Sequence, residues 1–104
     1  MRGDVFELRA PRRTSGHEQR GPRYAVVIQS DDLHLSTLII APTSTTARPT
    51  VFRPSLDILG RRARVLVEQA MAADPARLGR WVGRVTPHEL AEIEDALRLV
   101  LALD

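Results

Sequence analysis

The chain of 104 residues contains no cysteine, and this absence removes a large set of functions. Disulfide frameworks, thiol nucleophiles and thiolate metal sites all require the missing sulfur. Histidine is scarce too, because only His17, His34 and His88 occur, and none has the paired spacing of a metal-binding motif. We therefore expect neither a metal nor any other cofactor.

Long apolar runs are also missing. No stretch approaches the roughly 20 residues needed to cross a bilayer, and the start Arg2-Gly3-Asp4 differs from a secretory signal peptide. With 43% hydrophobic and 27% charged residues, the chain falls within the range of folded globular proteins. We expect one domain over residues 1–104, located in the cytoplasm and without membrane contact.

Lysine is absent as well, so all 15 basic residues are arginine. Arginine offers a planar fork of donors that fits phosphate oxygens, although a GC-rich genome also replaces lysine by arginine throughout. The distribution is more specific, because residues 1–64 hold 11 arginines and six acids, whereas residues 65–104 hold four and seven. The excess gathers in two loop-like stretches, which favours attraction of a phosphate backbone. The clustered residues are Arg9, Arg12, Arg13, Arg20 and Arg23, and then Arg61, Arg62 and Arg64.

Alternating and β-branched runs predict short strands at residues 3–9, 23–29 and 36–41, and we expect Pro42 to end the third. Residues 10–22 between the first two are polar and form a long loop. Such loops are usually functional when they exceed about 12 residues, so this one is the first candidate site.

The polar residues 43–49 are turn-forming and supply the second candidate site. The remaining elements before the C-terminus are predicted as strands at 50–53, 64–69 and 80–85, a loop at 54–62, and a helical turn from Asp74-Pro75 to Leu78.

The clearest local signal is a C-terminal helix. Thr86 is a suitable N-cap, Pro87 suits the first helical position, and Glu89 completes a capping box. One face that should cover a sheet carries Leu90, Ile93, Leu97, Val100 and Leu101. Short strands followed by a single terminal helix predict an α+β fold built on an antiparallel barrel or half-barrel.

Ordinary enzyme signatures such as a Gly-rich phosphate loop are absent. A set of short motifs nevertheless spans the chain: RGDV at 2–5, GHEQ at 16–19, RGPR at 20–23, VVIQSD at 26–31, IIAPTS at 39–44, VLVEQ at 65–69, RLG at 77–79 and VGRVTP at 82–87. In this order and spacing the motifs resemble the MazF/PemK toxin family.

The resemblance implies an SH3-like antiparallel β-barrel of the CcdB/MazF/PemK type with a C-terminal α-helix. It also implies a homodimeric, metal-independent endoribonuclease that cuts single-stranded RNA and inhibits translation and growth. The family's active arginine and threonine fall on Arg23 and Thr43. Arg23 is expected to stabilise charge on the phosphorane, Thr43 to hold a phosphate oxygen, and Glu18 to accept the 2′-OH proton.

The resemblance further implies a basic RNA-binding groove that also takes up a disordered, acidic antitoxin of the MazE type, because positive charge attracts both ligands. The residues expected to bind RNA are Arg12, Arg13, His17, Gln19, Arg20, Arg61 and Arg62.

Plainer roles remain open for the catalytic candidates: Arg23 as a surface ion-pair partner, Thr43 as a turn residue, and Glu18 as a residue that orders its loop. The sequence also departs from the family pattern at His17, at Tyr24 and around Ala63. Two other functions therefore stay open. One is a gyrase-binding toxin of the CcdB type, although the chain lacks an aromatic tail. The other is an inactive module that binds RNA or antitoxin.

Overall fold

The computed structural model of the chain describes residues 1–9 and 23–104. Its strands are β1 (Asp4–Leu8), β2 (Tyr24–Val27), β3 (Leu38–Ser44), β4 (Ser55–Ile58), β5 (Arg61–Val65), β6 (Met71–Ala73) and β7 (Leu78–Arg84). The helical elements are two short 3-10 helices, η1 (Val67–Gln69) and η2 (Pro75–Arg77), and one α-helix, α1 (Pro87–Leu101).

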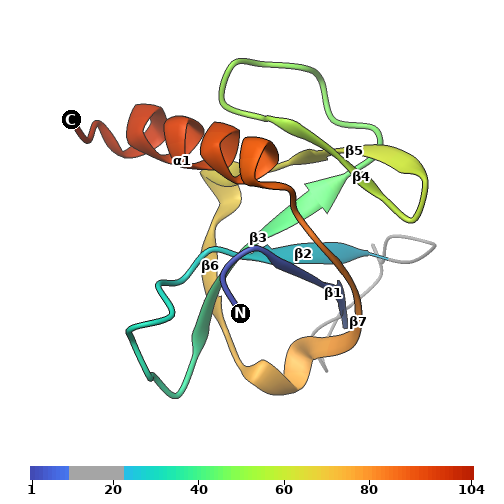
Figure 1. The fold of residues 1–104 in the computed structure, drawn as a ribbon, viewed down its shortest axis with the longest axis vertical. Helices are drawn as coiled ribbons and strands as arrows, with labels where there is room; N and C mark the ends of the chain where they lie inside the picture. Colours follow the sequence, from blue (N-terminus) through green and yellow to red (C-terminus); the bar gives the residue numbers. More distant parts are fainter. Residues whose placement is uncertain (10–22) are drawn as a thin grey trace, which may run out of the picture.

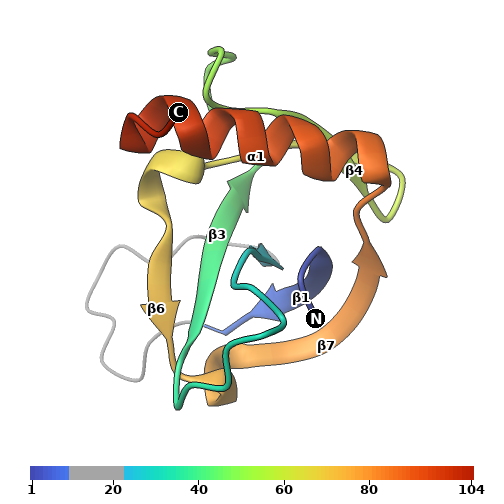
Figure 2. The same cartoon turned by 60° about the vertical axis from the view of Figure 1, so that its left-hand side comes forward.

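The strands form one curled antiparallel sheet. Its order is β4-β5-β3-β2-β1-β7, and β6 pairs with β3 outside this path. Figures 1 and 2 show that the sheet wraps into a half-barrel and that α1 lies across one end of it. The predicted α+β architecture, an antiparallel half-barrel with a C-terminal helix, is confirmed.

The core has two parts because β2 and β3 are buried on both faces. Val26 belongs to the larger cluster, which lies under α1 and includes Ile93 of that helix. Ala25 and Ile40 belong to a smaller cluster that includes Ala73 of β6. Alternating side chains of one strand thus serve both clusters, as the continuous apolar run in the sequence predicted.

The prediction that Pro42 ends the third strand is wrong, because β3 continues to Ser44. The Pro42 carbonyl accepts a hydrogen bond from Leu66 N at 2.8 Å. The N and O atoms of one residue point to the same side of a strand. The Pro42 nitrogen, which carries no hydrogen, therefore also faces the side on which β5 and β6 lie. There β3 changes its partner from β6, last paired at Ile40, to β5, first paired at Thr43. Proline is tolerated because no ladder bond is needed at this gap.

The prediction for residues 50–69 is largely wrong. Residues 50–53 form a turn rather than a strand, and the expected loop at 54–62 contains β4 and the start of β5. These two strands make a hairpin whose two-residue turn, Leu59-Gly60, has φ angles of 51° and 81°. Leu59 stands where asparagine is usual in such a turn, so the Asn-Gly signal is missing from the sequence. Leucine is also a poor residue for a left-handed conformation.

The strand predicted at 64–69 ends at Val65, after which η1 begins, and β6 was not predicted. The helical turn after Asp74 is confirmed, because the Asp74 side chain accepts from Ala76 N at 2.9 Å.

The C-terminal helix is confirmed together with its capping box between Thr86 and Glu89. Ile93 is buried, and Leu90 and Leu97 pack against the larger cluster. The predicted apolar face extends too far, since Val100 is 37% and Leu101 59% exposed. The contact of α1 with the larger cluster thus reaches Leu97, and Val100 and Leu101 lie outside it.

Candidate functional site

Arg23 immediately precedes β2 and is held there by backbone pairing. Its carbonyl accepts a hydrogen bond from Leu8 N at 2.8 Å, which ties the residue to β1. The side chain is half-buried, and its Nε atom is buried without a hydrogen-bond partner in the part of the chain that the structure describes. An unpaired buried donor costs about 1–3 kcal/mol, and native proteins keep few of them without a reason. Arg23 is therefore the strongest candidate for binding an anion.

Thr43 lies near the end of β3, where it is only 7% exposed. Its hydroxyl donates to the carbonyl oxygen of Tyr24 at 3.1 Å. The β2–β3 register, in which Ala25 pairs with Pro42, places Tyr24 opposite Thr43 when it is continued by one residue. The structure thus brings Thr43 to the strand position next to Arg23, and it commits the Thr43 O–H to the backbone.

Arg61 and Arg62 are exposed on β5, close to the turn of the β4–β5 hairpin. Arg62 donates to Ser55 Oγ at 3.1 Å. The hairpin joins the sheet at its other end, where Arg64 pairs with Ser44 of β3. Arg61 lies three residues further out, about 10 Å along the strand. Of the hairpin arginines, Arg64 is therefore nearest to the end of β3.

The other residues predicted for the site lie in 10–22, outside the described residues, and their roles stay predictions. They are Glu18, Arg12, Arg13, His17, Gln19 and Arg20.

An ion pair that the sequence did not predict ties the β3–β4 loop to η1. Arg53 donates to Glu68 Oε2 through Nε at 3.0 Å and through Nη2 at 2.7 Å. The two side chains are 23% and 24% exposed. Hydrogen bonding from Arg53 lowers the pKa of Glu68 below its ordinary value of 4.5, although partial burial opposes this shift. The only sequence signal was Glu68 itself, which stands in the VLVEQ motif.

A pocket of about 330 Å³ opens beside this ion pair. Arg64 spans part of it and donates to the Arg53 carbonyl at 3.0 Å. The acids Glu92 and Asp95 of α1 line the same pocket, so its charges are mixed. It is less suited to a polyanion than the surface next to Arg23. The full lining is Thr50, Val51, Arg53, Pro54, Ser55, Arg64, Glu92 and Asp95.

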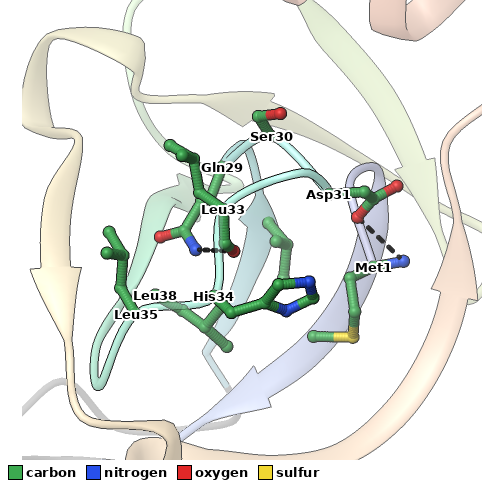
Figure 3. Close-up of a pocket in the computed structure, with 9 residues that line it drawn as sticks. Met1, Gln29, Ser30, Asp31, Leu33, His34, Leu35 and Leu38 are labelled. Carbon is green, nitrogen blue, oxygen red and sulfur yellow. Dashed lines mark hydrogen bonds and ion pairs between the residues drawn. The ribbon is translucent and has the colours of Figure 1, made fainter.

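A second pocket, of about 210 Å³, lies under the β2–β3 loop and is shown in Figure 3. His34 points toward Met1 across it. The Gln29 side chain in this pocket is already engaged, because its amide donates to Leu33 O and accepts from Ile39 N. Asp31 accepts from Arg2 N, which lowers the pKa of this carboxyl. These contacts anchor the loop and the N-terminus, so we assign the pocket a structural role.

Two possible features are not found among residues 1–9 and 23–104. No group of three or more His, Cys, Asp or Glu side chains lies in a position to hold a metal ion. Nor does this part of the chain include a helix long and apolar enough to cross a membrane.

The fold is an antiparallel half-barrel with a terminal helix and with exposed arginines on β5. Comparison with known proteins identifies the family that has this fold. Residues 1–101 match the family model of the PemK-like, MazF-like toxins of type II toxin-antitoxin systems. A Mycobacterium tuberculosis protein named as a candidate toxin, Rv3098A, is 38% identical over 104 residues, which cover 99% of this chain and 98% of that protein. The chain belongs to this toxin family.

Solved structures share the fold. A mycobacterial endoribonuclease in complex with its cognate antitoxin superimposes with a TM-score of 0.79 at 20% identity, covering 100% of this chain and 96% of that one. The Mycobacterium tuberculosis toxin MazF-mt6 gives 0.78 at 17% identity and 97% and 98% coverage. MazF from a MazE-MazF complex of Deinococcus radiodurans gives 0.77 at 24% identity and 99% and 96% coverage.

Proposed function

We propose that this toxin is an endoribonuclease that cuts single-stranded RNA, with messenger RNA as its main target, and needs no metal. The observation that carries the proposal is the position of Arg23. It occupies the arginine position of the family pattern, and it holds a guanidinium just before β2 whose buried Nε has no hydrogen-bond partner among residues 1–9 and 23–104. The match to the toxin family over residues 1–101 and the fold shared with a mycobacterial endoribonuclease support the same activity.

In the proposed reaction the ribose 2′-oxygen attacks the adjacent phosphorus and the bond from phosphorus to the 5′-oxygen breaks. The 2′-OH proton passes to a base, for which Glu18 is the predicted residue, and the leaving 5′-oxygen takes up a proton. The products are a 2′,3′-cyclic phosphate and a free 5′-hydroxyl. Arg23 stabilises the extra charge on the phosphorane, because a guanidinium stays charged at any relevant pH. Thr43 is the residue predicted from the family to hold a phosphate oxygen.

The proposed partners follow from charge. Residues 1–64, with an excess of arginine over acids, attract RNA and the acidic tail of a cognate antitoxin. The antitoxin then inhibits by occupying the RNA site. We also propose a homodimer, in which two copies of the basic surface form one longer groove. The complexes of the mycobacterial and Deinococcus radiodurans proteins with their antitoxins support an antitoxin as a partner of this chain.

The test is incubation of the purified protein with a long single-stranded RNA in EDTA, followed by mapping of the product ends. We expect discrete cuts that leave cyclic phosphate ends, and cleavage by Arg23→Ala that is slower by about 10² to 10³-fold. RNA binding without cleavage would identify an inactive binding module instead. Neither binding nor cleavage would favour a toxin that acts on a protein target.

A further inference from the structure

Trp81 is the single tryptophan of the chain, and the structure leaves it on the surface. It lies opposite Phe6 on β7, the last strand in the order of the sheet, and its side chain is 55% exposed. Leu78 and Val82, the other large apolar residues of β7, are half-buried. Tryptophan is a highly buried residue on average. Packing within the described part of the chain therefore does not account for this ring.

One hydrogen bond holds the indole in place without using either of its faces. Trp81 Nε1 donates to Asp4 Oδ1 at 3.2 Å, and this N–H lies in the plane of the ring. In the part of the chain that the structure describes, the cation–π contact found joins Arg53 with Phe52, so no described arginine covers the indole. A rigid aromatic ring that is already oriented can stack on a flat ligand at a low cost in conformational entropy.

Arginines lie on both sides of Trp81 along β7. The side chains of Arg80 and Arg84 are each more than half exposed. Arg84 donates through Nη1 to the Asp4 oxygen at 3.1 Å, and Arg80 lies 3.8 Å from Glu7. A guanidinium has five donors, so these contacts leave most of them for a ligand. An exposed ring between two cations fits single-stranded nucleic acid, which offers flat bases and phosphates together.

The strand β1 connects this surface to Arg23. Leu8 N donates to the Arg23 carbonyl, and Leu8 also pairs with Leu78 at the start of β7. Trp81 is opposite Phe6, which lies two residues from Leu8 along β1. The usual strand spacing and rise therefore put the backbone of Trp81 roughly 12 Å from that of Arg23. One RNA strand can reach both residues, and a group bound at Trp81 is not the reacting phosphate.

We propose that Trp81 stacks on an unpaired base of the RNA beside the cut site, and that Arg80 and Arg84 bind the phosphates next to this base. The proposal rests on the proposed endoribonuclease function and extends the bound RNA across β1 to β7. Stacking contributes affinity with little base preference, because every base has a π face. It also favours RNA that is unpaired around the cut, since bases in a duplex are already stacked. No bond forms or breaks at Trp81.

The fluorescence of the full-length protein reports on this position alone, because the chain has one tryptophan. The probe is an RNA oligonucleotide that the wild type cuts, made non-cleavable by a 2′-deoxyribose at the cut site. We expect this strand to quench the Trp81 emission, and its duplex form to quench much less. A series of strands that each carry an abasic unit at a different position should identify one position where quenching is lost. Unchanged emission on binding, with binding measured independently by anisotropy of a labelled strand, would overturn the proposal.

Variants test whether the ring contributes to binding. Trp81→Ala should weaken binding of the intact strand about tenfold, the usual effect of one stacked base, and Trp81→Phe should lose less because it keeps an aromatic ring. With the abasic strand, Trp81→Ala and the wild type should bind equally. In cleavage, Trp81→Ala should raise KM and keep kcat within about threefold, because the ring lies away from the reacting atoms. Arg98→Ala is the control and should bind both strands like the wild type.

The remaining outcomes separate this role from others. Equal binding by Trp81→Ala and the wild type would overturn the proposal, and so would equal losses on the intact and abasic strands together with a lower melting temperature. Emission that changes with protein concentration without RNA, with a smaller assembly for Trp81→Ala in sedimentation, would overturn it by assigning the ring to a contact between two copies. A wild type that binds RNA but cuts none would remove only the endoribonuclease function, because the binding comparison still decides the role of Trp81. A wild type that binds no RNA would overturn both.

Discussion

Arg23 is the residue on which the proposed chemistry depends most. Arg23→Ala should lower kcat for RNA cleavage by about 10² to 10³-fold, because the phosphorane loses a charged donor in a preorganised position. Arg23→Lys should recover only part of this loss, since an ammonium lacks the planar fork. The measurement is single-turnover cleavage. Arg98→Ala, on the exposed side of α1, is the matched control and should cleave normally. Full activity in Arg23→Ala would contradict the assignment.

Glu68 gives the protein a stability that depends on pH. Its pKa is lowered by Arg53, so the pair contributes stability above about pH 4.5, and this is lost as pH falls through the lower folded value. Glu68→Gln should therefore cost roughly 1–2 kcal/mol at pH 7, and the difference from the wild type should shrink below pH 4.5. Urea unfolding at several pH values measures it.

A more exposed ion pair provides the control for Glu68. Arg98 and Asp95 are 51% and 78% exposed, against 23% and 24% for Arg53 and Glu68. Water screens the exposed pair, so Asp95→Asn should change the free energy of unfolding by well under about 1 kcal/mol. Equal effects of Asp95→Asn and Glu68→Gln at pH 7 would show that the Arg53–Glu68 pair has no special role.

Among the elements, the β4–β5 hairpin contains a residue, Leu59, that is unfavourable for the backbone conformation of the turn. Leu59 adopts a φ of 51° and is 60% exposed, so it gains little from burial in return. Leu59→Asn should stabilise the protein by about 0.5–1 kcal/mol, because asparagine tolerates this conformation and Asn-Gly suits such turns. Leu59→Val should have the opposite sign. Thermal melting of the three proteins tests the order, and a less stable Asn variant would refute the turn assignment.

The β3 strand shows how one element organises the site. It pairs with β2 on one side, and on the other side with β6 and then with β5. This exchange brings the arginine before β2 and the arginines of the hairpin to the same end of β3. A strand that stopped at Pro42, as the sequence predicted, would leave neither Thr43 nor Ser44 in the sheet. The continuation of β3 therefore creates the candidate site.

At the scale of the whole molecule, the uneven charge predicts how binding responds to salt. RNA affinity should fall as salt rises, and Arg61→Ala combined with Arg62→Ala should reduce the slope of log K against log salt by about 1.4 if both contact phosphates. Arg98→Ala should leave the slope unchanged. Fluorescence anisotropy with the non-cleavable strand measures it. An unchanged slope in the double variant would place the RNA away from the hairpin.

Sequence reasoning succeeded where the signal lies within a few adjacent residues. The cap at Thr86 and Glu89, the helical turn after Asp74 and the apolar run of β2 each depend on local spacing, and each is present. It failed over residues 50–69. In that segment the hairpin turn has Leu59 in place of the usual asparagine, so the sequence does not show it. The composition of β4 does not mark it as a strand either, and only its pairing with β5 does so.

By itself, then, the sequence determined several local elements, the half-barrel class and the toxin family, and Arg23 stays a prediction from the sequence. The tertiary structure decided which residues meet: Arg53 with Glu68, and the end of β3 with β5, where Ser44 pairs with Arg64. The physical reason is register. A shift of one residue between two strands moves every side chain to the other face of the sheet, and no pattern within a single strand records that alignment.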